Sequence, residues 1–504
     1  MANAGIDHSD VQGLVRFAYA HLPESCFLLL EIENGAAARS WLAAITQSLT
    51  TAERLSERPK TALQVAFTRQ GLQALGVPES TINGFSPEFI SGMSGEESRS
   101  RRLGDVQSNA PSAWQWGGPG KVPHVMLMLY AAAGALESWQ KSVVEKLPQG
   151  GVKLLRQLGN SVADGYEPFG FRDGMSQPEI DWKLERQVGS KDQLEYGNLV
   201  SAGEWLLGYA NEYGKYTDRP LVDPKEDPEN KMLFAEEQPD KKDLGRNGAY
   251  LVLRQLEQDV PGFWQFLDAQ SNHDPKERRK LAESMVGRTM EGEPLVPLAS
   301  SPIAGIGPDR DDIRLNQFTY ESDSDGIRCP FGAHIRRANP RNPDLPYGTK
   351  GFLSWLIRTA GFGRKSIRDD LIASTRFHRI LRRGRRYGKR LSPDEAIQMG
   401  KTDGEERGIY FIGLNANIGR QFEFVQNAWI MGTKFDGLTE ESDALIGNRE
   451  LVPGCPVTNT FSIPQESGVR RRIAGMPQFV TVRGGAYFFL PSIRALRYFA
   501  GIGG

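Results

Sequence analysis

The sequence has few cysteines and few histidines. Its 504 residues include three cysteines, Cys26, Cys329 and Cys455, and no two of them form a C-x-x-C pair. This pattern favours neither a disulfide framework nor a zinc knuckle, so we interpret each cysteine as a small buried apolar side chain. None of the six histidines has the H-x-x-x-H or H-E-x-x-H spacing of a zinc enzyme. Any metal site must therefore use very few imidazoles.

Long apolar runs and an excess of one charge are also lacking. No stretch approaches the roughly 20 consecutive apolar residues of a membrane span. The first residues, MANAGIDHSD, match no export signal, so we expect a cytoplasmic location. Lys and Arg number 61 against 62 Asp and Glu, for a formal net charge of −1. This balance provides no overall field for nucleic acid or an anionic membrane, and we expect neither as a partner.

The first two hundred residues follow the order β-α-β-β-α-β. Short apolar runs typical of strands alternate with two helical patterns. That order is typical of the split βαβ, or ferredoxin-like, unit, in which helices cover one face of an antiparallel sheet. Strands are expected at 26–32, 62–68, 124–131 and 152–158, and helices at 37–49 and 134–147.

A second, longer unit of the same kind is expected after residue 200. Its strands are predicted at 204–214, 249–258, 408–418 and 479–491, with a helix at 262–270. About 150 residues then separate its second and third strands, and insertions of that length usually carry function. We therefore predict an α+β protein with two ferredoxin-like domains, 1–200 and 201–504, of the dimeric α+β barrel type, with long insertions in the second.

His334 has the most distinctive surroundings of the six histidines. It lies in CPFGAHIRRANPR (329–341), where small residues precede it and Arg336, Arg337 and Arg341 follow it. Small neighbours allow a flat ligand to come close, and arginines suit forked pairing with carboxylates. From these residues alone, a ligand and a core histidine beside a basic surface are equally acceptable interpretations.

The other five histidines have weaker contexts. We expect His8, His21 and His273 at the surface and His124 as a half-buried structural histidine on an apolar strand, while His378 falls in the basic segment described next.

Arginines gather in RFHRILRRGRRYG (376–388), which includes Arg382 and Arg383. Taken alone, the segment is best explained as a solvated basic face or a phosphate site.

A third segment, GFRDG (170–174), places Asp173 between Arg172 and Gly174 on a tight loop. Nearby glycines let backbone approach a ligand closely, although an ordinary Asp-Gly turn explains the pattern equally well.

Together and in this order, the three segments resemble the dye-decolorizing peroxidases. GFRDG matches the G-x-x-D-G signature of that family, CPFGAHIRRANPR its proximal histidine segment, and HRILRRGRRYG its distal arginine segment. The resemblance spans roughly 160–490 and includes GEWLLGYANEYG, AYLVLRQLEQDV and NIGRQFEFVQNAW as supporting strands. The arginines after Gly384 depart from the family pattern, which often has an apolar residue there.

The resemblance implies a haem peroxidase that reduces hydrogen peroxide and oxidises small phenols or dyes by one-electron steps. It implies one haem b per chain in the C-terminal domain, and it leaves a homo-oligomer open. His334 is then the axial ligand of the iron, Arg336, Arg337 and Arg341 are expected at the haem propionates, and Asp173 and Arg382 act on peroxide. Arg382 is a better match than Arg383 for the distal arginine.

Two further points remain open in the sequence. The ring nitrogen of His334 that does not bind iron should donate to a hydrogen-bond acceptor, and Glu423 is our candidate for this acceptor. The alternative function is haem handling, meaning storage, transfer or iron removal, with incidental peroxidase activity.

Overall fold

A computed structural model describes residues 5–159, 164–187, 196–299, 315–341, 374–400, 404–449 and 457–502. Cys26 and Cys329 are buried, as expected, and Cys455 lies outside the described residues. Among the helices of the described ranges, none combines the length and apolarity needed to cross a membrane.

The N-terminal unit has the β-α-β-β-α-β order that the sequence predicts. Its strands pair in the order β2-β3-β1-β4, which is the ferredoxin-like arrangement. The strand β3 is buried at every position because it lies inside the sheet with side chains packed on both faces. The elements are β1 (Glu24–Ile32), α1 (Gly35–Thr46), β2 (Thr61–Phe67), β3 (Val125–Ala131), α6 (Leu136–Glu145) and β4 (Val152–Gly159).

The C-terminal unit repeats this arrangement with strands far apart in the sequence. Its strands pair in the order β10-β12-β9-β15, and β11 also pairs with β12. They are β9 (Ala249–Gln258), β10 (Leu381–Arg382), β11 (Arg385–Tyr387), β12 (Gly408–Asn415) and β15 (Val480–Leu490). One helix of the unit is α7 (Val260–Gln270), and π-helical turns η8 (Gly419–Glu423) and η9 (Val425–Met431) take the place of the other.

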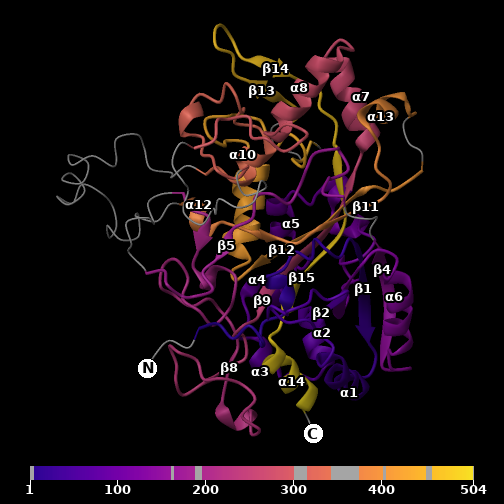
Figure 1. Ribbon diagram of the computed structural model, residues 1–504, viewed down its shortest axis with the longest axis vertical. Coiled ribbons are helices and arrows are strands. Elements are labelled where there is room, and N and C mark those ends of the chain that lie inside the picture. The colour runs from indigo at the N-terminus through magenta and orange to yellow at the C-terminus, as the bar shows by residue number, and fades with distance from the viewer. Residues whose placement is uncertain are drawn as a thin grey trace, which may run out of the picture.

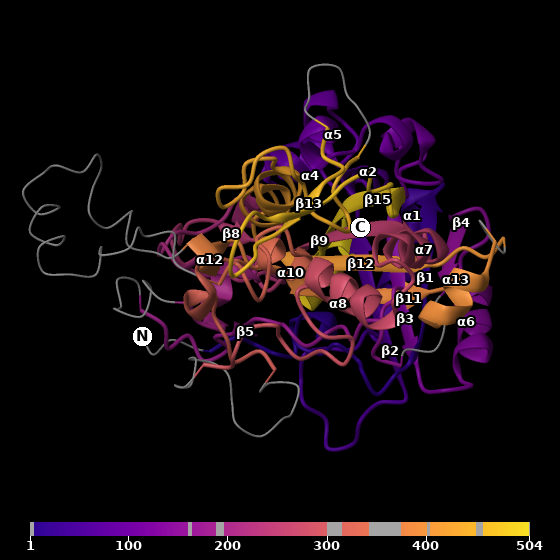
Figure 2. The same ribbon diagram turned by 90° about the horizontal axis from the view of Figure 1, so that it is seen from above.

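The two units share one sheet. Phe489 of β15 pairs with Phe67 of β2, which joins them into a nine-stranded antiparallel sheet. The last helix, α14 (Ile493–Gly501), packs against α1 of the first unit. Figure 1 shows α14 beside α1 at the bottom of the molecule, and Figure 2 shows the same structure from above. The fold is α+β, while the boundary at residue 200 stays a prediction.

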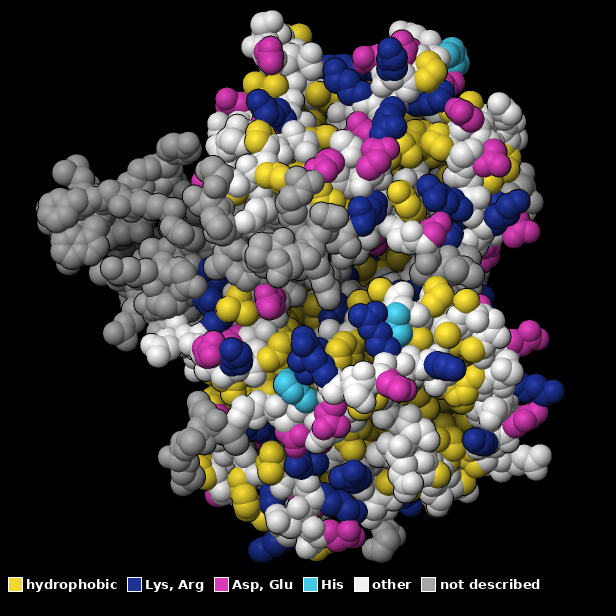
Figure 3. Space-filling model, in the orientation of Figure 1, with side chains coloured by type: hydrophobic (Ala, Val, Ile, Leu, Met, Phe, Trp, Pro, Cys, Tyr) yellow, Lys and Arg dark blue, Asp and Glu magenta, His cyan; other side chains and the backbone are white. Residues whose placement is uncertain are grey.

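Shorter elements surround the sheet. They are α2 (Arg69–Ala74), α3 (Glu79–Ile82), α4 (Pro87–Ser91), α5 (Glu97–Leu103), β5 (Glu179–Ile180), β6 (Leu199–Val200), β7 (Leu221–Val222), β8 (Lys242–Asp243), α8 (Pro275–Val286), α10 (His334–Ala338), α12 (Ser374–Phe377), α13 (Pro393–Gln398), β13 (Phe461–Ile463) and β14 (Arg471–Ile473). The helices α7, α8 and α13 lie together at the top of the molecule in Figure 1. On the face shown in Figure 3, acidic and basic side chains are intermixed, in line with the balanced composition.

The strand predicted at 204–214 is wrong. After a short 3-10 turn at Ala202–Glu204 the chain makes further turns, and Gly208 has a φ of 84°. Trp205 and Leu206 are fully buried against one face of the sheet and do not form a strand of it. The apolar run thus reflects burial, which residues in turns share with residues in strands.

The second strand of this unit is instead the arginine-rich segment that contains β10 and β11. The long insertion therefore lies between the first and second strands, and the predicted order of strands was shifted by one. The prediction of a supporting strand at 417–429 is also wrong, because this segment forms the π-helical turns η8 and η9.

Candidate active site

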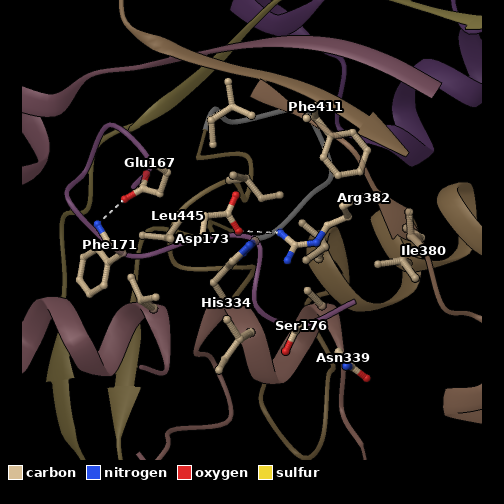
Figure 4. A pocket seen from close by; sticks show the side chains of 18 of the residues that line it. Glu167, Phe171, Asp173, Ser176, His334, Asn339, Ile380, Arg382, Phe411 and Leu445 are labelled. Atoms are coloured by element: carbon tan, nitrogen blue, oxygen red, sulfur yellow. Dashed lines mark hydrogen bonds and ion pairs between the residues drawn. The ribbon is translucent and has the colours of Figure 1, made fainter. Parts of the chain in front are cut away.

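A cavity of about 280 Å³ lies beside the C-terminal sheet, where the three sequence motifs meet. Asp173, His334 and Arg382 all line it, although they come from three distant segments. Most of the remaining lining is apolar and includes Phe169, Phe171, Leu256, Val286, Ile380, Phe411, Val425 and Leu445. Figure 4 shows the His334 ring directed toward the paired side chains of Asp173 and Arg382.

Asp173 is held as a carboxylate. Its Oδ1 accepts hydrogen bonds from the backbone N–H of Gly174 at 2.6 Å and from Nη1 of Arg382 at 3.1 Å. Burial raises the pKa of Asp173, but the charge of Arg382 and these hydrogen bonds outweigh burial and lower the pKa below its usual 3.8. From the described residues, Oδ2 receives no hydrogen bond, so this oxygen is available to accept a proton.

The strand geometry separates Arg382 from Arg383. Neighbouring side chains of a strand point to opposite faces. Arg382 points into the cavity, with 35% of its side chain exposed there. Arg383 points away from it and donates to the backbone carbonyls of Leu14 and Val15. The guanidinium of Arg382 is therefore the one that can act in the cavity, as the sequence favoured.

His334 is the first residue of α10, and Asp443 orients its ring. Nδ1 of His334 lies 2.9 Å from Oδ2 of Asp443, a fully buried carboxylate. Since a carboxylate can only accept, Nδ1 carries the proton and the lone pair of Nε2 is left for the cavity. Burial lowers the pKa of His334, but the charge of Asp443 and the hydrogen bond to it raise the pKa by more, so the net shift is upward. Burial raises the pKa of Asp443, and the charge of His334 reverses that shift.

The choice of Glu423 as partner of His334 was therefore wrong. Glu423 pairs with Arg99 at 2.7 Å and accepts the hydroxyl of Tyr487 at 2.9 Å. It belongs to the π-helical turn η8, and its carboxylate faces the α5 side of that turn. Asp443 carried no signal in the sequence, because it lies 109 residues from His334 and its backbone contacts resemble an ordinary Asp turn.

Two of the three arginines after His334 lie outside the cavity lining. Arg336 pairs with Asp323 at 3.1 Å. Arg337 is fully buried and donates to the carbonyls of Trp429, Gly432 and Glu441, at the carboxyl end of η9. The expectation that Arg336 and Arg337 reach a ligand in the cavity is corrected on this ground, because their donors are occupied by the protein itself.

Arg341 does line the cavity, together with two arginines that the sequence did not indicate. We call Arg288, Arg341 and Arg379 the arginine row; all three are buried. They donate to carbonyls and to the side chains of Ser176, Asn198 and Asn316, and within the described ranges none is paired with a carboxylate. Burial, with the nearby charge of Arg341, lowers the pKa of Arg288 to about 10. Among the described residues, the row therefore meets no anion that balances its charges.

Two more titratable side chains face the cavity. His378 stacks on Phe424 and its Nδ1 lies against the carbonyl of Arg420, while burial lowers its pKa to about 4, so it is neutral. Glu167 accepts the N–H groups of Phe169 and Phe171, and burial raises its pKa to about 7. The remaining histidines lie elsewhere: Nδ1 of His124 accepts the N–H of Ile32, as expected for a structural role.

Comparison with known proteins gives one consistent answer. No protein-family model matches the chain. The dye-decolorizing peroxidase msp1 of Mycetinis scorodonius is 26% identical over 98% of this chain and 88% of its own length. The multifunctional dye peroxidase DyP2 of an Amycolatopsis species is 27% identical over 86% of this chain and 81% of its own length.

Solved structures agree with these sequences. A fungal DyP-type peroxidase from Auricularia auricula-judae superposes with a TM-score of 0.71, at 26% identity, over 99% of this chain and 100% of its own. A dye-decolorizing peroxidase with an engineered heme pocket gives a TM-score of 0.72, at 25% identity, over 98% of this chain and 100% of its own. The chain is thus similar along nearly its whole length to the dye-decolorizing peroxidases.

Proposed function

We propose that this protein is a haem peroxidase that reduces hydrogen peroxide and oxidises phenolic or dye-type reductants in one-electron steps. The observation that carries this function is the pair of Asp173 and Arg382 facing His334 in one apolar cavity. A haem carrier needs the imidazole, but it has no use for a proton acceptor and a fixed cation opposite the imidazole. The pair therefore favours peroxidase turnover over haem handling.

The residues of the cavity fit one haem b per chain. Nε2 of His334 would hold the iron, and the partner Asp443 would make the imidazole more electron-donating. Apolar side chains such as Phe411 and Leu445 suit the faces of a macrocycle. The arginine row offers buried cations that meet no carboxylate in the part of the chain that the structure describes. Such cations suit propionates, so we assign the binding of the propionates to Arg288, Arg341 and Arg379.

Haem, when bound, supplies the two-electron reduction of peroxide and the one-electron oxidation of the reductant. Asp173 accepts a proton from one peroxide oxygen at Oδ2 and returns it to the other oxygen, which leaves as water. Arg382 stabilises the negative charge that develops on these oxygens as the O–O bond breaks. The lining around the pair is largely apolar, and such surroundings of low dielectric constant strengthen both interactions. A cytoplasmic location and a homo-oligomer stay predictions.

The proposal is tested by adding haem to the purified protein and recording its absorption spectrum, then its peroxide-dependent oxidation of a phenol. We expect a Soret band and turnover. A missing Soret band would contradict haem binding altogether. A Soret band without turnover would instead make haem handling the function.

Arg382→Leu should keep haem and slow the reaction with peroxide. Removing one fixed hydrogen-bond donor of this kind typically costs about 10²–10³-fold in rate. Stopped-flow mixing of the ferric protein with peroxide measures the effect. Arg390→Leu, at an exposed arginine just after the same segment, is the matched control. A greater loss of rate in a folded Arg383→Leu variant would show that the neighbouring arginine acts in the cavity.

The assignment of the arginine row predicts a preference for free carboxylates. Metal-free protoporphyrin IX should bind the protein at least about tenfold more tightly than its dimethyl ester, because the ester removes both anionic partners. Fluorescence titration measures both affinities without any turnover. In the double variant Arg341→Met, Arg379→Met the preference should largely disappear. Equal affinities in the unmodified protein would refute the assignment.

A further inference from the structure

Gln177 joins two of the segments that form the active site. It follows Asp173 on the same loop, and its Oε1 accepts the backbone N–H of Arg382 at 2.9 Å. Gln177 itself does not line the cavity, so it cannot touch peroxide or reductant there. Its hydrogen bond to the backbone of Arg382 connects it to the reacting groups.

The strand that carries Arg382 needs such a contact. β10 has two residues and, among the described strands, lies at the edge of the sheet and pairs with β12 alone. Along an antiparallel strand, successive N–H groups point alternately toward the partner strand and away from it. The N–H of Arg383 donates to Ile412 of β12, which leaves the N–H of Arg382 on the outer edge. The side chain of Gln177 satisfies this otherwise unpaired group.

The loop thus holds Arg382 at both ends. Gln177 accepts from its backbone, and Asp173 accepts from its guanidinium at 3.1 Å. The loop is in turn fixed at Ser176, whose hydroxyl oxygen accepts a hydrogen bond from Nη2 of Arg341 at 2.8 Å. The proton acceptor and the cation therefore lie on two segments whose separation is set by a few side-chain hydrogen bonds.

We propose that Gln177 is a positioning residue that fixes Arg382 relative to Asp173 for the reaction with peroxide. The proposal rests on the proposed function, because it gives Gln177 a role only if Arg382 stabilises charge in the cavity. Small displacements of a group that stabilises charge lower the rate steeply, since such a group must already be in place as the charge develops.

Gln177→Met tests the proposal in the haem-loaded protein. Methionine has nearly the same length but offers no oxygen to the N–H of Arg382. Losing one hydrogen bond of this kind should slow the reaction with peroxide about 2- to 10-fold and weaken cyanide binding to the ferric protein by a similar factor. Haem content should stay the same, because Gln177 lies outside the cavity lining.

A double-mutant cycle separates positioning from a general structural role. In an Arg382→Leu background, Gln177→Met should cause no further loss, because the group it positions is absent. Gln265→Met, which removes a half-buried glutamine bonded to the carbonyls of Ala396 and Met399, is the control and should leave both readouts unchanged.

Two results would overturn the proposal. One is an equal loss in both backgrounds, which would mean that Gln177 supports the fold and not Arg382. The other is an unchanged rate and cyanide affinity in Gln177→Met. Failure of the proposed function shows differently, as an unmodified protein without a Soret band or without reaction with peroxide.

Discussion

His334→Ala should lose most of its haem. A partner that orients a metal-bound histidine typically contributes about 10- to 100-fold in metal affinity, and the ligand itself contributes more. The loss should be largely reversed by imidazole in the buffer, since the truncated side chain leaves room for it beside Asp443. Haem per chain after gel filtration, with and without imidazole, measures both effects.

His378→Ala is the matched control, because His378 is the other imidazole that lines the cavity within the described ranges. Its Nδ1 is engaged by the carbonyl of Arg420 and its ring stacks on Phe424, so we expect it to keep haem. Haem loss in His378→Ala, together with full haem occupancy in His334→Ala, would mean that His378 and not His334 holds the haem.

The four strands and two main helices of the first ferredoxin-like unit could be predicted because local pattern and tertiary environment agree there, whereas the short helices α2 to α5 were not predicted. Its apolar runs lie in strands, of which β1, β2 and β3 are almost wholly buried and β4 is partly exposed at the sheet edge, and its two helical patterns each form one helix. The hydrophobic pattern is the main signal of secondary structure, and here nothing competes with it.

The second unit shows where that signal misleads. The buried run around Trp205 packs on the sheet without pairing, so burial was taken for a strand. The true second strand, β10 and β11, carries arginines that are buried through hydrogen bonds to carbonyls, as Arg383 is. A charged strand of this kind resembles a solvated face in the sequence, because the carbonyls that bind a side chain such as Arg383 lie hundreds of residues away.

The site was predictable where one short motif carries the reacting group, and not where the group acts through distant contacts. Asp173, His334 and Arg382 meet in one cavity, as the order of the motifs suggests. Asp443, Arg288 and Gln177 have no local signature, since each is defined by a partner on another segment. Arg336 and Arg337 illustrate the opposite error, in which nearness in sequence to His334 was taken for a place in the cavity lining.

Asp173→Asn should keep the Soret band and lose peroxide activation. Asparagine has nearly the same shape, but its amide accepts no proton. General acid–base assistance typically contributes about 10²–10⁴-fold, so the rate with peroxide should fall within that range. Stopped-flow measurement gives the rate, and Asp164→Asn, an exposed carboxylate earlier on the same loop, should leave it unchanged. A loss much smaller than this would mean that another group accepts the proton.

The pH profile tests the same carboxylate independently. Burial raises the pKa of Asp173, but Arg382 and the N–H of Gly174 outweigh burial and hold it below the usual 3.8. The base form therefore persists in mildly acidic solution, and activity should fall only as the pH drops through this lowered pKa. In Arg382→Leu burial is no longer opposed by that charge, so the acidic limb should move to higher pH. In Asp173→Asn the limb should vanish, and an acidic limb at the same pH in all three proteins would assign it to another group.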